Sequence, residues 1–188
     1  KSLRKLITFG YEGNWEAGIR ESKWLDHTTM LLVAAIHGIE KLQKGISVLV
    51  HCSDGWDRTP QATSLIMLMS DPFYRTIRGF ICLVQTQWCN FGHKFLTRLH
   101  SNSGQVGPIF IQFMDCVYQV MKQFPKKFEF TEELLVFLID HAYSGWFFTF
   151  LGDTMKFRFP AMIAKGCQCA FQAALEVQEY FVNKDYVK

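Results

Sequence analysis

Apolar and polar residues alternate along most of the chain with the period of an α-helix. The stretch "WLDHTTMLLVAAIHGIEKLQKG" (24–45) has apolar residues three and four positions apart and ends in Gly45, which predicts a helix stopped by that glycine. "TPQATSLIMLMS" (59–70) is also helical in pattern, with Thr59 as a candidate N-cap and Pro60 in the first turn. Further helices are predicted over about 74–99, 108–124 and 131–144, with a moderately amphipathic tail at 160–182.

One short segment, "ISVLVH" (46–51), departs from this period and is predicted to be a strand. The segment is rich in β-branched residues and apolar on both faces, which is typical of a buried strand in a parallel sheet. "KLITFG" (5–10) is a weaker second candidate. Two strands cannot cover 46–51 on both faces, so we expect the sheet to be completed by sequence upstream of this chain.

Composition narrows the class of protein. The chain has 188 residues, of which 49% are hydrophobic and 18 are Phe. It is therefore long and apolar enough to form one packed domain, which excludes a disordered tail. A net charge of +3 is too small to indicate a nucleic-acid partner. No uncharged apolar run reaches the roughly 18 residues of a membrane span, and no signal peptide is visible.

The six cysteines lie mostly in apolar segments and lack the spacing of metal ligands. Cys167 and Cys169 are separated by one residue, so they do not form a C-x-x-C pair. We therefore expect a reduced, cytosolic protein that uses neither a metal nor a cofactor.

The stretch "VLVHCSDGWDRTPQ" (48–61) carries the candidate chemistry. A strand, a short loop and a helix N-terminus create an anion site, because the first N–H groups of a helix lack intrahelical partners. Gly55 allows the left-handed turn that such a loop needs, and Arg58 offers a planar fork for two phosphate oxygens. This environment would keep Cys52 as a thiolate that attacks phosphorus, with Thr59 placed to hydrogen-bond the sulfur.

Two observations weigh against this interpretation. Asp54 and Asp57 lie close to Cys52, and negative neighbours raise the pKa of a thiol. A bare Cys-x5-Arg also arises by chance roughly 0.2 times in a chain of this composition. The preceding strand, the internal glycine and the following helix favour a phosphatase loop over an incidental turn.

The motif "HCSDGWDRT" resembles the active-site loop of the myotubularin phosphatases. The resemblance covers about residues 2–152 and includes "ESKWLDH", "YRTIRGF", "FGHKF", "PIFIQFMDCVYQ", "QFPKKFEF" and "FLIDHAYS". It implies an α/β, tyrosine-phosphatase-like fold that is mostly helical in this portion around a strand–loop–helix core. It also implies removal of the 3-phosphate from phosphatidylinositol 3-phosphate and phosphatidylinositol 3,5-bisphosphate through a phosphocysteine.

The same resemblance assigns the loop residues. Cys52 is the expected nucleophile and Arg58 the phosphate ligand, while Asp57 is the expected proton donor to the leaving oxygen. Asp54 would accept hydrogen bonds from substrate hydroxyls. Ser53, Gly55 and Trp56 would complete the phosphate cradle and its rim, although Trp56 could equally be a packed loop aromatic. Asp26, in "WLD", is a competing acid, but it sits where a helix N-cap is the simpler interpretation.

Lys94 and Arg98 lie four positions apart in "FGHKFLTRLH". Like charges at this spacing on a helix are unfavourable without an anion between them, which suggests a second phosphate. By resemblance these positions meet the 5-phosphate, but the first is commonly arginine in the family. Lysine loses the bidentate fork, which would weaken preference for the bisphosphate. The alternative is a solvated basic face.

The expected organisation is the C-terminal part of a phosphatase domain over 1–152, followed by a divergent helical tail over 153–188. The resemblance further implies a cytoplasmic protein held peripherally on endosomal membranes by phosphoinositide lipids, and homo- or heterodimers with other myotubularins. Two other functions stay open. A protein-tyrosine or dual-specificity phosphatase shares the loop, although two acidic loop residues argue against it. A non-catalytic scaffold is the other, although Cys52 and Arg58 are both present.

Overall fold

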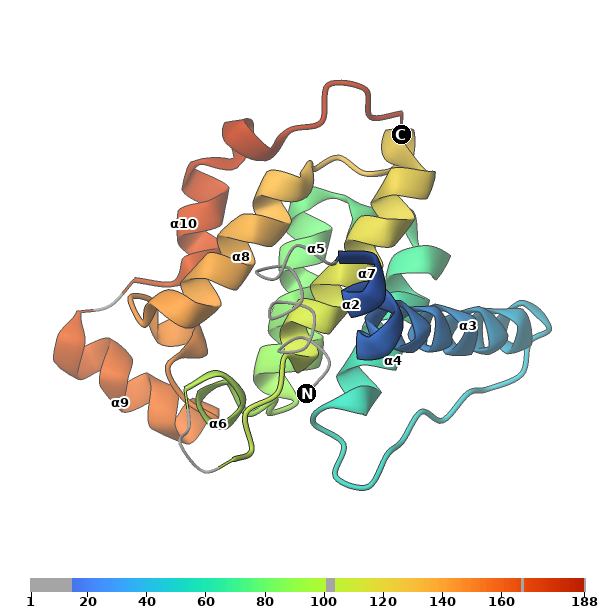
Figure 1. Cartoon of the computed structure of the whole chain (residues 1–188). Coiled ribbons are helices and arrows are strands. Elements are labelled where there is room, and N and C mark those ends of the chain that lie inside the picture. The colour runs from blue at the N-terminus through green and yellow to red at the C-terminus, as the bar shows by residue number, and fades with distance from the viewer. Residues whose placement is uncertain (1–14, 101–103, 167, 188) are drawn as a thin grey trace.

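The computed structural model describes residues 15–100, 104–166 and 168–187, and these residues form a cluster of packed helices (Figure 1). The α-helices are α2 (Trp15–Ser22), α3 (Trp24–Gln43), α4 (Arg58–Ser70), α5 (Ile77–Val84), α6 (Phe95–Leu99), α7 (Ile109–Gln123), α8 (Glu132–Ser144), α9 (Met155–Lys165) and α10 (Ala170–Glu176). Shorter turns are η1 (Pro72–Arg75), η2 (Gln85–Asn90, a π-helix), η3 (Pro125–Lys127), η4 (Phe148–Phe150) and η5 (Gln178–Phe181).

The helix that follows the candidate loop lies at the centre of this cluster. α4 contacts α3 on one side and α7 and α5 on others, and its Leu65 and Leu68 are fully buried. Aromatic side chains fill the interior between these helices. The fully buried ones are Trp88, Phe80, Phe95, Phe110, Phe113, Phe128, Phe130 and Phe150. This packing fixes the direction of α4 and therefore the position of the loop at its N-terminus.

The predicted strand at 46–51 is wrong for the part of the chain that the structure describes. These residues form an extended connection from Gly45 to Cys52, and the side chain of Leu49 is 87% exposed. A strand exists only through ladder hydrogen bonds to a neighbour, and the described residues supply no neighbour here. Their one isolated bridge lies elsewhere, between Phe130 and Val182.

The four long helices predicted at 24–45, 59–70, 108–124 and 131–144 are confirmed as α3, α4, α7 and α8. Thr59 is not an N-cap, because α4 begins at Arg58 and Asp57 occupies the cap position.

The single helix predicted over 74–99 is instead divided into η1, α5, η2 and α6. Thr76 starts a new helix by accepting a hydrogen bond from the Gly79 N–H at 3.0 Å. Gly92, at φ +84°, then turns the chain before α6.

The C-terminal segment packs against the rest of the helices. Ala170, Phe171 and Ala174 of α10 are buried, and so is Phe181 of η5. The N–H of Thr131 donates to the carbonyl of Phe181 at 2.8 Å, which joins η5 to the start of α8. The amphipathic tail predicted at 160–182 thus comprises the end of α9, α10 and η5. The second strand candidate, 5–10, lies outside the described residues.

No helix among the described residues is both long and apolar enough to span a membrane.

Candidate active site

The loop Cys52–Arg58 curls around the sulfur of Cys52. Gly55 adopts the predicted left-handed conformation, with φ +87°, and its N–H donates a hydrogen bond to Cys52 Sγ at 3.2 Å. The hydroxyl of Thr59, in the first turn of α4, donates to the same sulfur at 3.2 Å. The predicted contact between Thr59 and the thiol is therefore present.

These hydrogen bonds decide the ionisation of the thiol. Burial opposes the thiolate, but the Thr59 hydroxyl and the N–H groups of Gly55, Asp54 and Thr59 overcome it and lower the pKa of Cys52 from 9.0 to about 7. At neutral pH a large fraction of Cys52 is then the nucleophilic thiolate. The pKa of Cys52 is lowered despite the two nearby aspartates, and the backbone N–H of Asp54 is itself one of the groups that lower it.

The outer side of the loop is exposed. Nη2 of Arg58 donates to the hydroxyl oxygen of Ser53 at 3.2 Å, and that hydroxyl lies 3.4 Å from Oδ2 of Asp54. Ser53, Asp54 and Arg58 are all exposed, and of these three Arg58 also lines the hollow beside Cys52.

The inner side of the loop is held by Asp57. Its carboxylate accepts hydrogen bonds from Nε of Arg98 at 3.2 Å and from Nη2 of Arg98 at 2.7 Å, and it lies 3.2 Å from Nδ1 of His93. Burial alone would raise the pKa of Asp57, but the hydrogen bonds from His93 and Arg98 lower it to about 2. Asp57 is therefore ionised at neutral pH in this arrangement, and it can donate a proton only after part of this network is released.

His93 is a positioning residue that the sequence did not single out. It is fully buried, and its Nδ1 lies 2.7 Å from the carbonyl oxygen of Trp56, 37 positions earlier in the chain. Its ring packs edge-on against Trp88 and Phe95. Trp88 in turn donates from Nε1 to the Ser64 hydroxyl of α4 at 3.0 Å. His93 thus ties the loop backbone to the aromatic core.

Lys94 and Arg98 both meet the loop, although they reach different residues. Nζ of Lys94 lies over the ring of Trp56, 4.0 Å from its centroid, while Arg98 binds Asp57. Trp56 is half-buried, so it is partly packed and partly at the rim. The two cations line one side of the loop, and neither is fully exposed.

A hollow of about 560 Å³ opens beside Cys52. Its walls come from α3, the 46–51 connection, α4 and α7, and they include His27, Gln61 and Arg58. Gln61 is buried and donates to the carbonyl of Ile109 at 3.1 Å and to Oε1 of Gln112 at 3.0 Å. Neither His27 nor Gln61 was expected at the site, because only the packing of α3 and α7 on α4 brings them there.

Asp26 does not line this hollow. It lies exposed in the first turn of α3, where the cap residue is Lys23 rather than Asp26. The predicted N-cap role of Asp26 is therefore wrong.

Comparison with known proteins bears on this arrangement. Residues 1–159 match the family model described as "Myotubularin-like phosphatase domain". The chain is 42% identical over its whole length to "Myotubularin" of Xenopus tropicalis and to "Myotubularin" of Rattus norvegicus, and it covers 33% of each. It is 45% identical, over 83% of its length, to "Phosphatidylinositol-3,5-bisphosphate 3-phosphatase mtm-1" of Caenorhabditis elegans, of which it covers 28%. The chain thus spans about a third of these curated relatives.

Proposed function

Because the chain belongs to the myotubularin-like phosphatase family, we propose that it is the catalytic part of a cysteine-dependent phosphoinositide 3-phosphatase. The substrates are phosphatidylinositol 3-phosphate and phosphatidylinositol 3,5-bisphosphate. The observation that carries the proposal is the thiol of Cys52, which receives hydrogen bonds from Thr59 and Gly55 and has a pKa of about 7. The name printed for the nematode relative supports the lipid class.

The first step is displacement at phosphorus by the Cys52 thiolate. The sulfur attacks in line, the bond from phosphorus to the inositol 3-oxygen breaks, and a phosphocysteine forms. Arg58 and the loop N–H groups stabilise the negative charge on the phosphoryl oxygens. Water then breaks the phosphorus–sulfur bond, and the Thr59 hydroxyl stabilises the departing thiolate through the contact it already makes at 3.2 Å.

The leaving inositol oxygen needs a proton, and we assign its delivery to Asp57. In the structure Arg98 and His93 hold this carboxylate ionised. A phosphate at the inositol 5-position that draws Arg98 away would remove one of the groups that lower the pKa of Asp57, which would favour its protonated form. The bisphosphate would then promote its own hydrolysis, and Lys94 would stabilise the same phosphate from its position over Trp56.

We further propose that the protein works as a peripheral protein on the cytoplasmic face of endosomal membranes, where such lipids are presented. Dimers with another myotubularin chain are compatible with this assignment. Asp54 and Ser53, both exposed on the outer side of the loop, would contact the inositol ring.

The test is release of inorganic phosphate from water-soluble, short-chain forms of the two lipids, measured by a colorimetric phosphate assay. The wild-type protein should release phosphate, whereas Cys52→Ser should lose at least about three orders of magnitude of rate, as expected for loss of a nucleophile. A phosphotyrosine peptide serves as the competing substrate. Faster hydrolysis of the peptide than of either lipid would contradict the proposal, and so would activity in Cys52→Ser.

A further inference from the structure

Helix α9 (Met155–Lys165) has an exposed surface that is unusually apolar. Phe157 and Ile163 are each 68% exposed, and Phe159 is 53% exposed. Arg158 is the one side chain of this helix described as buried, and its guanidinium donates to the carbonyls of Thr149 and Cys89. Arg158 therefore anchors α9 to the core, while Phe157 and Ile163 lie mostly in solvent and Phe159 borders a hollow between α9 and the core.

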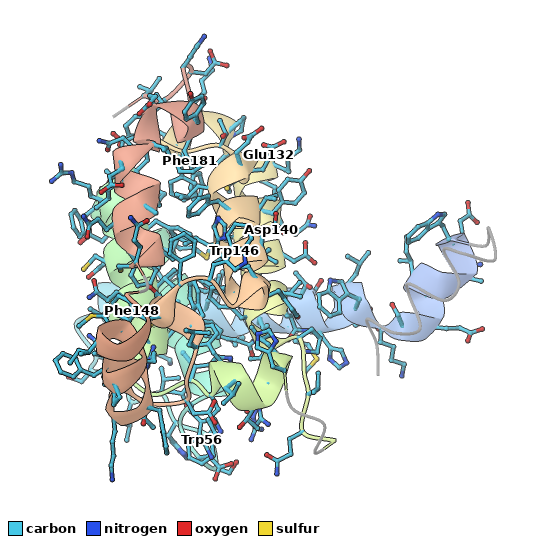
Figure 2. The ribbon with its side chains drawn as sticks, turned by 90° about the vertical axis from the view of Figure 1, so that its left-hand side faces the viewer. Trp56, Glu132, Asp140, Trp146, Phe148 and Phe181 are labelled. Atoms are coloured by element: carbon cyan, nitrogen blue, oxygen red, sulfur yellow. The ribbon has the colours of Figure 1, made fainter. Side chains whose placement is uncertain are left out.

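A chain of contacts places α9 beside the catalytic loop. Asp153, two positions before α9, accepts hydrogen bonds from the N–H of Thr97 at 3.0 Å and from its hydroxyl at 2.6 Å. Thr97 belongs to α6, and the next residue, Arg98, binds Asp57 of the loop. Figure 2 shows the same relation: α9 and α6 lie at the end of the molecule where Trp56 is labelled, and Phe181 and Glu132 lie at the opposite end.

The charges around this end suit an anionic surface. The sequence of α9, "MKFRFPAMIAK", contains no acidic residue, and its Lys156 is exposed, whereas Arg158 is committed to the core. The segment from Gln85 to His100 also contains no acid and contributes Lys94, while its Arg98 is paired with Asp57; on the loop itself the exposed Arg58 offsets the exposed Asp54. Asp153 is the single acidic residue between Trp146 and Gly166, and its carboxylate already accepts two hydrogen bonds from Thr97.

We propose that the exposed face of α9 inserts into the interface of an anionic phospholipid bilayer and so holds the loop of Cys52 over its lipid substrate. The proposal rests on the proposed function, since it assumes that the loop acts on a membrane lipid. Helices of this kind bury aromatic and aliphatic side chains at the level of the headgroups, with basic residues attracted to anionic lipids. Because Asp153 joins α9 to α6, and Arg98 of α6 binds Asp57 of the catalytic loop, the insertion and the chemistry would occur at one end of the molecule.

The experiment compares two matched double variants of the protein. Phe157→Gln/Ile163→Gln removes the proposed insertion, and neither residue belongs to the catalytic loop. Val136→Gln/Tyr180→Gln is the control, because these side chains are similarly exposed, at 52% and 74%, near the labelled Glu132 and Phe181 at the opposite end. Circular dichroism verifies that both variants remain folded.

Binding is measured by co-sedimentation with vesicles of phosphatidylcholine and phosphatidylserine that contain no phosphoinositide. We expect the α9 variant to bind at least about fivefold more weakly than wild type, since it loses two inserted apolar side chains, while the control variant is unchanged. Absence of vesicle binding by the wild type, or equal binding by the α9 variant, would overturn the proposal. So would size-exclusion chromatography showing that the α9 variant only abolishes self-association, which would make this face a contact between protein copies.

Phosphate release separates this proposal from the proposed function. Against water-soluble phosphatidylinositol 3-phosphate, the α9 variant should match wild type, and against the same headgroup in vesicles it should be slower in proportion to its weaker binding. If wild type fails to hydrolyse the soluble lipid, the proposed function is contradicted, whereas the sedimentation result still decides the role of α9. Equal loss on soluble and vesicle substrates would contradict the insertion.

Discussion

The segments on the two sides of the catalytic loop differ sharply in how they are held. Downstream, Leu65 and Leu68 of α4 are fully buried in the hydrophobic core, whereas upstream Leu49 is 87% exposed and the 46–51 connection forms no strand pair with any described residue. Yet the groups that lower the pKa of Cys52 come from the loop itself and from Thr59 of α4. The loop and the first turn of α4, rather than the 46–51 connection, therefore supply the hydrogen bonds that lower the pKa of Cys52.

The same contrast appears in the two aspartates of the loop. Asp57 faces the packed side, where His93 and Arg98 lower its pKa to about 2, and Asp54 is exposed beside Ser53. Closeness in sequence to a reactive cysteine does not determine the environment of a carboxylate, because the partners of Asp57 come from residues far along the chain. Asp57 is thus both the ion-pair partner of Arg98 and the proposed proton donor.

The largest effect is expected from Asp57→Asn. The substitution removes the proton donor, so turnover of phosphatidylinositol 3,5-bisphosphate, whose 5-phosphate is proposed to free Asp57 from Arg98, should fall by about 100-fold or more, as is typical for loss of a general acid. Substrate binding, measured by calorimetry with a water-soluble lipid, should be retained. Asp26→Asn is the matched control and should stay within about threefold of wild type, because Asp26 is exposed and does not line the hollow beside Cys52. Equal losses in the two variants would contradict the assignment.

The difference in burial between α4 and the 46–51 connection predicts different losses of stability on truncating a leucine in each. Leu68→Ala should lower the free energy of unfolding by about 2–5 kcal/mol, because it opens a cavity in a fully packed core. Leu49→Ala should change it by less than about 0.5 kcal/mol, since the side chain is mostly in solvent. Urea unfolding followed by tryptophan fluorescence measures both. A large loss from Leu49→Ala would show that the upstream side is packed in solution.

A smaller effect is expected from Thr59→Val, which keeps the shape of the side chain but removes its hydrogen bond to Cys52. The pKa of the thiol should rise from about 7 toward its ordinary 9.0. Below the pKa each unit of rise lowers the thiolate fraction about tenfold, so alkylation of Cys52 by iodoacetamide should slow and its pH profile should move to higher pH. Thr63→Val is the control, because the hydroxyl of Thr63 donates to the backbone carbonyls of Thr59 and Pro60, one turn earlier in α4, and not to Cys52. Identical profiles for wild type and Thr59→Val would exclude the role of Thr59.

The smallest effect is expected from Lys94→Arg. Arginine restores a bidentate fork for a second phosphate, so the ratio of turnover on the bisphosphate to turnover on the monophosphate should rise by roughly two- to fivefold. The comparison uses both water-soluble lipids at concentrations below saturation. No change in the ratio would place Lys94 outside the recognition of the 5-phosphate and leave its contact with Trp56 as a packing interaction.

The sequence predicted the features that depend on local spacing. The long helices α3, α4, α7 and α8 follow from their apolar period, and the left-handed turn at Gly55 follows from the freedom of glycine. The strand at 46–51 could not be judged locally, because a strand exists only with a partner. The division of the predicted helix at 74–99 depends on the cap at Thr76 and the turn at Gly92, which outweigh an otherwise continuous helical pattern.

In the site, too, contacts between residues close in sequence could be predicted, whereas contacts between distant residues could not. Cys52, Gly55 and Thr59 lie within a few positions of one another, so their mutual contacts could be anticipated. The network around Asp57 could not, because His93 and Arg98 reach it across the fold, Arg98 from 41 positions away. The signal available in advance was the pair of cations in "FGHKFLTR", which pointed to an anion but not to a carboxylate of the loop itself.

The most direct test of the central claim is rapid-quench capture of the covalent intermediate. The protein is mixed with water-soluble phosphatidylinositol 3-phosphate labelled at the 3-phosphate, quenched in acid, digested and mapped by mass spectrometry. The account predicts transient phosphorylation of Cys52, none in Cys52→Ser, and slower formation at pH values below about 7 as the thiolate is lost. Phosphate release without any label on Cys52, or label on another residue, would contradict it.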